Sequence, residues 1–127
     1  MARRGIRVQG LTPARKAEVT AACERLIAAT KARFLPEIRP NGLHYPVDIR
    51  GRWRGEAYAL AVRFRSDAPD AIEKEYDAPY ARLHHVGGRF SVEWMRHTGR
   101  WWPLRDGLTL EEAIDYIATA GVLRPPI

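Results

Sequence analysis

The sequence has little cysteine and no long apolar run, and each shortage excludes a class of protein. One cysteine, Cys23, occurs among the 127 residues, so no disulfide can form within the chain. A single thiol is typical of a reducing compartment, and we expect a cytoplasmic protein. No stretch approaches the ~20 apolar residues of a membrane helix, and no apolar run typical of a signal peptide follows the basic N-terminus. We therefore expect no membrane partner.

The familiar motifs for metals and nucleotide cofactors are also missing. No HExxH, CxxC, GxGxxG or GxxxxGK[ST] spacing occurs. The adjacent His84 and His85 point to opposite faces of a predicted strand, so this pair does not chelate one metal. We therefore expect neither a metal nor a cofactor. If the protein is an enzyme, the remaining hypothesis is a small nuclease, metal-dependent or histidine-based, with His97, His84 and Glu93 as candidate catalytic residues.

Positive charge is in excess. The chain has 21 lysines and arginines against 15 acidic residues, a net charge of +6. This excess favours a polyanionic partner such as nucleic acid. Most of the basic residues are arginines, however, and a genome rich in G and C would favour arginine without any binding role. Charge alone therefore does not establish the partner.

Two amphipathic helices are predicted, one near each end of the chain. Thr12 and Pro13 are typical of a helix start, and apolar residues then recur at steps of three and four until Pro36. Thr109 and Glu112 have the spacing of a capping box at the start of the second helix. Each helix has one apolar face, so both are expected to cover a common core.

Between the helices the apolar period changes to two, which predicts β-strands. The second of three hairpins is expected to turn at Gly87-Gly88 and the third at residues 97–99, with Gly99 in a G1 bulge. The predicted fold is α+β, a five-stranded antiparallel meander with the N-terminal and C-terminal helices packed on one face. Residues 1–127 are expected to form a single domain, with a flexible basic arm at 1–10 and an extended tail at 122–127.

Matching apolar positions across the hairpins predicts which side chains face the helices. Trp94 is expected opposite Trp102, and Val92 opposite Leu104, all on the inner face. Trp101 then points outward. The acidic stretch 66–79 is expected to be an irregular connection. The predicted open face joins an arginine-rich half to an apolar half, made of Arg50, Arg52, Arg54, Arg63, Arg65, Tyr80, Met95 and Trp101.

Basic groups beside aromatic rings suit nucleic acid, because arginines hold phosphates while rings stack bases. We therefore expect a nucleic-acid binding module, for single-stranded or structured nucleic acid, with Arg96 and Arg100 of the third turn added to the open face. The alternative is a protein partner, with the chain as an inhibitor or immunity-type accessory factor anchored by Trp101, Met95 and Arg100. A homodimer through the open face would also cover it.

Three segments carry a family resemblance: GRWRGEAYAL, EYDAPYARLHHVGGRFSVEWMRHTGRWWPL and GLTLEEAIDYI. They resemble an uncharacterised family of small bacterial proteins in which an aromatic strand, an arginine-bearing turn, a W-x-x-L motif and an amphipathic helix follow one another. The resemblance covers about residues 51–120. It implies no activity, ligand or catalytic residue.

Overall fold

The computed structural model describes residues 10–127, so nearly all of the expected basic arm at 1–10 lies outside the described residues. The predicted order of two helices around five strands is confirmed, and a short 3₁₀ turn, η1, follows the second helix. The elements are α2 (Pro13–Phe34), β1 (His44–Arg54), β2 (Ala57–Ser66), β3 (Glu75–Val86), β4 (Arg89–Met95), β5 (Trp101–Leu108), α3 (Leu110–Thr119) and η1 (Gly121–Leu123).

Both helices begin where the sequence predicts. The side chain of Thr12 accepts a hydrogen bond from the backbone N–H of Arg15 at 3.0 Å, with Pro13 in the first turn. At the start of α3, Thr109 and Glu112 form both hydrogen bonds of a capping box, at 2.9 and 3.1 Å. No helix of residues 10–127 is long and apolar enough to cross a membrane.

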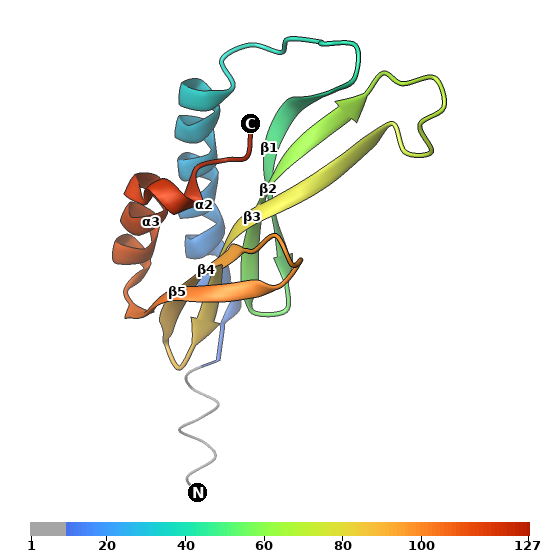
Figure 1. Ribbon diagram of the computed structural model, residues 1–127. Coiled ribbons are helices and arrows are strands. Elements are labelled where there is room, and N and C mark those ends of the chain that lie inside the picture. Colours follow the sequence, from blue (N-terminus) through green and yellow to red (C-terminus); the bar gives the residue numbers. More distant parts are fainter. Residues whose placement is uncertain (1–9) are drawn as a thin grey trace, which may run out of the picture.

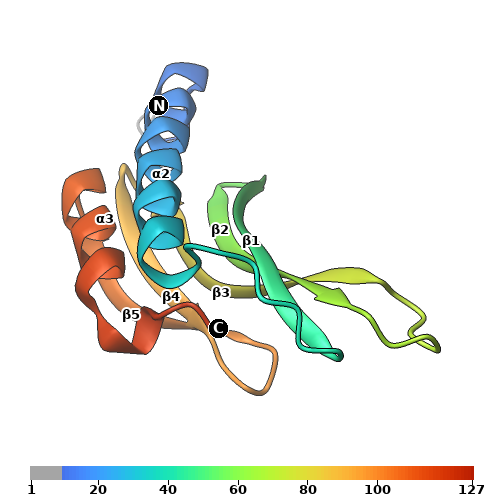
Figure 2. The ribbon, with the colours of Figure 1, turned by 90° about the horizontal axis from the view of Figure 1, so that it is seen from above.

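The five strands form one antiparallel sheet in the order β1-β2-β3-β4-β5. Both helices lie on one side of it, and no helix of residues 10–127 covers the opposite side, which we call the open face (Figure 1). Seen from above, β2 and β3 extend past the helices as a long arm (Figure 2). The predicted α+β meander is therefore confirmed, including the helices packed on one face.

The hairpin between β3 and β4 has the predicted register. Leu83 lies opposite Val92 and Arg82 opposite Glu93, around the Gly87-Gly88 turn. The next turn is also confirmed, since Gly99 has a φ of 81° and donates to the carbonyl of Arg96 at 2.8 Å. These two turns needed only local sequence, because their glycines fix both loop length and register.

Two expectations about β3 are wrong. Residues 75–79 are not an irregular connection, since β3 begins at Glu75. Tyr80 is not on the open face, because its side chain is 8% exposed and packs in the core. The cause is a register shift: Leu60 pairs with Ala81 but Ala61 pairs with Pro79, so Tyr80 is an extra residue. A bulge of this kind reverses the alternation of side chains along a strand.

A register shift between β4 and β5 also makes part of the expected pairing of β5 wrong. Trp94 does pair with Trp102, but Val92 lies opposite Arg105 instead of Leu104. Pro103 has no N–H to donate to the ladder, and the register shift lies beside it, opposite Glu93. Trp102 is 52% exposed, so its predicted place in the core is wrong.

The core lies between the sheet and the two helices. Its largest fully buried side chains include Tyr58, Phe90 and Ile49. The tail closes one end of this core, because Leu123 of η1 is 2% exposed. The expected extended tail at 122–127 therefore begins as part of a 3₁₀ turn, and it is anchored by an apolar side chain.

Candidate functional site

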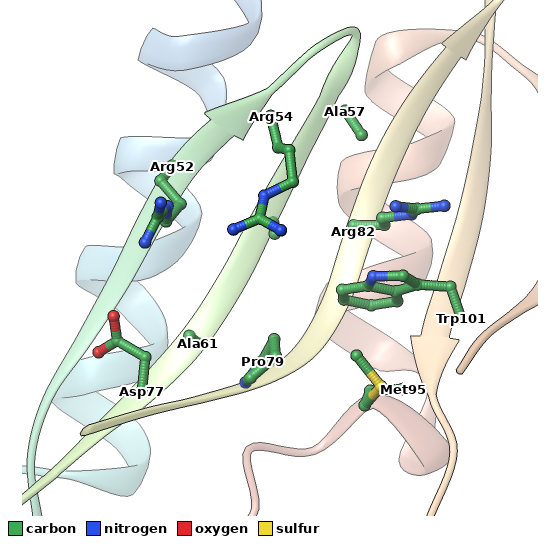
Figure 3. A pocket seen from close by; sticks show the side chains of 10 residues that line it. Arg52, Arg54, Ala57, Ala61, Asp77, Pro79, Arg82, Met95 and Trp101 are labelled. Atoms are coloured by element: carbon green, nitrogen blue, oxygen red, sulfur yellow. The ribbon is translucent and has the colours of Figure 1, made fainter. Parts of the chain in front are cut away.

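The open face contains a pocket of about 290 Å³. Trp101 and Met95 lie on one side of it, and Arg52 and Arg54 lie on the opposite side (Figure 3). Strands β1, β2, β3, β4 and β5 all contribute to it, so it forms only when the whole meander is assembled. The lining residues are Arg52, Arg54, Ala57, Ala59, Ala61, Asp77, Pro79, Arg82, Met95 and Trp101.

Small side chains line the β2 part of the pocket. Ala57, Ala59 and Ala61 occupy alternate positions of β2 and share the open face with the arginines opposite them on β1. Large residues at these positions would fill the space between β1 and β5. The depth of the pocket therefore comes from three alanines whose alternation is visible in the sequence, although no motif marks them as part of a site.

Trp101 is held by a network on the last three strands. The guanidinium carbon of Arg82 lies 4.8 Å from the centroid of the Trp101 ring. Arg82 also donates from Nε to the carboxylate of Glu93, whose side chain is 12% exposed. The same carboxylate lies 3.7 Å from Nδ1 of His84. Arg82 is thus committed to protein partners, and Trp101 is fixed at the pocket wall as the sequence register predicts.

Arg52 and Arg54 have no such partners. Both side chains are exposed, and within the described part of the chain no ion pair or hydrogen bond engages either one. Both point over the pocket from β1 (Figure 3). We call this region, made of Arg52, Arg54 and the pocket beside them, the pocket end of the open face. Its two arginines can neutralise an anion without first breaking an internal contact.

The predicted arginines farther along β2 are already paired. Nε of Arg63 lies 3.1 Å from Glu75, and its Nη1 lies 3.2 Å from Asp77. Nε of Arg65 lies 3.0 Å from Glu75. Hydrogen bonds to Asp77 and Glu75 raise the pKa of Arg63, and those from Arg65 and Arg63 lower the pKa of Glu75. We call these four residues the ion-paired end of the open face.

Arg50 is also paired. Its Nε lies 3.2 Å from Asp48, which Lys31 of α2 approaches to 2.9 Å from another direction. Burial alone would raise the pKa of Asp48, but hydrogen bonds from Lys31, Arg50 and the backbone of Ile49 outweigh it and lower the pKa. Of the five arginines predicted on this face, Arg52 and Arg54 are therefore the two that remain uncommitted among residues 10–127.

The candidate residues Arg96, His97 and Arg100 of the third turn do not lie in the pocket lining. The guanidinium carbon of Arg96 lies 4.9 Å from the Trp102 ring, away from the pocket lining, whereas Arg100 is exposed in the turn. His97 is exposed there too, and no hydrogen bond or ion pair in the described range involves its side chain. The predicted catalytic set is thus divided: Nδ1 of His84 lies 3.7 Å from Glu93, and within the described residues no hydrogen bond or ion pair links His97 to either.

One histidine contact was not foreseen. His85 is 6% exposed, and its Nδ1 lies 3.0 Å from a carboxylate oxygen of Glu56 in the β1–β2 turn. Sequence alone gave no signal for it, because the long connection between β2 and β3 hides their register. No group of three or more histidine, cysteine, aspartate or glutamate side chains that could hold a metal is found in the described residues.

The fold and the pocket define a small α+β protein in which no helix of the described residues covers one face of the sheet. The chain belongs to a family described as a domain of unknown function, DUF3024, whose model matches residues 12–122. This match includes both helices, so it is longer than the resemblance noted over about residues 51–120. No curated protein matches the chain, and no solved structure matches it either.

Proposed function

We propose that the protein binds single-stranded nucleic acid on its open face. The observation that carries this proposal is the pocket end, where two uncommitted arginines lie across a shallow cavity from Trp101. Arginines supply phosphate contacts, and aromatic side chains supply sequence-tolerant stacking with bases. The net charge of +6 adds long-range attraction for a polyanion.

Four residues of the pocket support this proposal most directly. Arg52, Arg54, Trp101 and Met95 line the pocket together, so they form the centre of the proposed surface. Arg50, Arg63 and Arg65 act at its margin, because acidic side chains already neutralise them. Tyr80 is buried and takes no part.

We also place this activity in the cytoplasm. The single cysteine, Cys23, is fully buried in the core, and burial raises the pKa of its thiol to about 12. It is therefore a packing residue with no reactive thiolate near neutral pH. A chain whose stability depends on no disulfide fits a reducing compartment.

Fluorescence anisotropy with a labelled single-stranded octanucleotide tests the proposal. We expect binding at low salt that weakens as salt rises, because bound phosphates displace counterions. Trp101→Ala should weaken binding by about 5- to 150-fold, the equivalent of ~1 to 3 kcal/mol for one stacked base. Trp102→Ala is the matched control, since it removes a tryptophan outside the pocket lining. Absence of binding at low salt, or equal effects of the two substitutions, would contradict the proposal.

A second candidate, a protein partner, is favoured by the exposure of Trp102. This ring is 52% exposed beside the third turn, with Arg96 stacked over it. Tryptophan and arginine are enriched among residues that dominate binding energy at interfaces. A pull-down from nuclease-treated extract, compared between wild type and Trp102→Ala, tests this surface independently of the pocket. Partner recovery that does not depend on Trp102 would exclude it as the anchor.

A further inference from the structure

We propose that the pocket seats a single nucleotide, with its base against Trp101 and its phosphate toward Arg52 and Arg54. This inference rests on the proposed function and adds to it how many bases are held and in which orientation. A flat platform would let several successive bases stack. This pocket instead has an apolar wall on one side and two cations on the other. It therefore selects a single ligand group that is apolar at one end and anionic at the other.

The size of the cavity supports one nucleotide. At about 290 Å³ it lies at the lower limit of the ~300 to 1,000 Å³ that is usual for small-molecule sites. Trp101 is the one aromatic side chain in its lining, and Met95 and Pro79 complete the apolar side. A second base would have no ring to stack on there, because Tyr80 faces the core.

The orientation follows from the charges around the pocket. Arg52 and Arg54 are alternate residues of β1, so their side chains leave the strand on the same side about 6 to 7 Å apart. Each can donate two hydrogen bonds to one phosphate. Arg82 is unavailable for this role because it binds Glu93 and stacks on Trp101. The phosphate therefore belongs on the β1 side and the base on the β5 side.

The ion-paired end sets the direction in which a longer strand leaves the pocket. Asp77 lines the pocket on the β3 side, and its pairing with Arg63 leaves no excess positive charge there. Glu75 continues this neutral region along the arm. A phosphate backbone gains nothing along β2 and β3 beyond Asp77, so we place the neighbouring nucleotides away from the arm.

The experiment fills the pocket without changing its charge. Ala59 lies opposite Arg52 on one side and Arg82 on the other, at the centre of the floor. Ala59→Leu adds three carbons at this point, and Ala59→Val is a smaller, β-branched change that suits a strand. Ala28→Leu, at an exposed position of α2 outside the pocket, is the matched control. Thermal unfolding establishes that each variant is folded before binding is measured.

Calorimetric titration then compares four deoxynucleoside monophosphates, their nucleosides, inorganic phosphate and the octanucleotide. We expect at least one monophosphate to bind wild type, with its nucleoside and inorganic phosphate each weaker by tenfold or more. Ala59→Leu should weaken both the monophosphate and the octanucleotide at least tenfold, Ala59→Val should do so to a smaller degree, and Ala28→Leu should leave both unchanged.

The outcomes separate this inference from the proposed function. If wild type binds the octanucleotide but no monophosphate, and Ala59→Leu and Ala59→Val have no effect on that binding, the single-nucleotide pocket is wrong while the binding face stands. If wild type binds a monophosphate in an Ala59-dependent way but no octanucleotide, the pocket stands and the strand-binding function is wrong. If inorganic phosphate binds as tightly as the monophosphates, the assignment of the base to Trp101 is wrong.

Discussion

The two ends of the open face contain the same residue type in the same alternation, yet they differ in what is left to bind a ligand. Arg52 and Arg54 at the pocket end have no acidic partner within residues 10–127. Arg63 and Arg65 at the ion-paired end share Glu75 and Asp77. The difference teaches that arginines counted along a strand do not define a binding surface until the opposing strand is known.

The largest expected effect tests which residues belong to this face at all. Tyr80→Ala should lower the free energy of unfolding by about 3 to 5 kcal/mol, because it removes a buried aromatic ring. Burial also raises the pKa of Tyr80 to about 12, consistent with a hydroxyl held away from water. Urea denaturation measures the loss. Tyr80→Phe is the control, expected to be nearly neutral because no hydrogen bond engages this hydroxyl in the described region. A stable Tyr80→Ala variant with weaker oligonucleotide binding would return Tyr80 to the open face.

The next effect compares the two ends directly. The double substitution Arg52→Ser, Arg54→Ser should weaken octanucleotide binding by about tenfold or more. It should also reduce the slope of log K against log salt concentration by about 1.4, because two phosphate contacts are lost. Arg63→Ser with Arg65→Ser removes the same charge from the ion-paired end, where we expect less than about a threefold loss. Anisotropy titrations at four salt concentrations measure both. Equal losses would mean that overall charge, and not the pocket end, governs binding.

A gain of binding should follow when the ion-paired end is released. Glu75→Gln with Asp77→Asn leaves Arg63 and Arg65 without acidic partners, so we expect about a three- to tenfold increase in affinity and a steeper salt dependence. The control is Asp70→Asn with Glu73→Gln, an equal change of charge at exposed positions of the connection before β3. If both pairs of substitutions raise affinity equally, local neutralisation is not what separates the two ends.

The smallest effect is a pH dependence. Hydrogen bonds from Arg65 and Arg63 hold the pKa of Glu75 below its usual value of 4.5. The ion pairs therefore contribute to stability above about pH 4.5, and the contribution is lost as the pH falls through the lower pKa of the folded state. NMR titration of the Glu75 carboxyl group measures this pKa. In the Arg63→Ser, Arg65→Ser variant it should rise toward the usual value, and an unchanged pKa would show that these ion pairs do not form.

Local sequence was enough to predict the elements and two turns. The cap at Thr12, the capping box at Thr109 and the glycines of the turns act within a few residues, so the sequence determines them directly. The outward position of Trp101 was predicted for the same reason, since it depends on the short turn that ends at Gly99.

The parts that could not be predicted depend on pairing between distant segments. Nothing local marks Tyr80 as an extra residue, and the β2–β3 register that reveals it spans a long connection. The ion pairs of Arg63 and the contact of His85 with Glu56 depend on that same register. The alanines and Pro79 of the pocket lining could not be predicted for another reason. They leave space instead of supplying a reactive group, so no sequence motif marks them.

The bulge at Tyr80 has a consequence for the whole arm. Because it reverses the alternation in β3, every residue on its N-terminal side faces the opposite way, and this is why Glu75 and Asp77 meet Arg65 and Arg63. If Tyr80 were instead paired in the ladder as an ordinary residue, these acids would face the helix side. The bulge, and not the composition of β3, therefore sets the charge of this half of the open face. The arm therefore keeps its charge balance only while the bulge holds the consecutive side chains of Tyr80 and Ala81 on the same, buried side of β3.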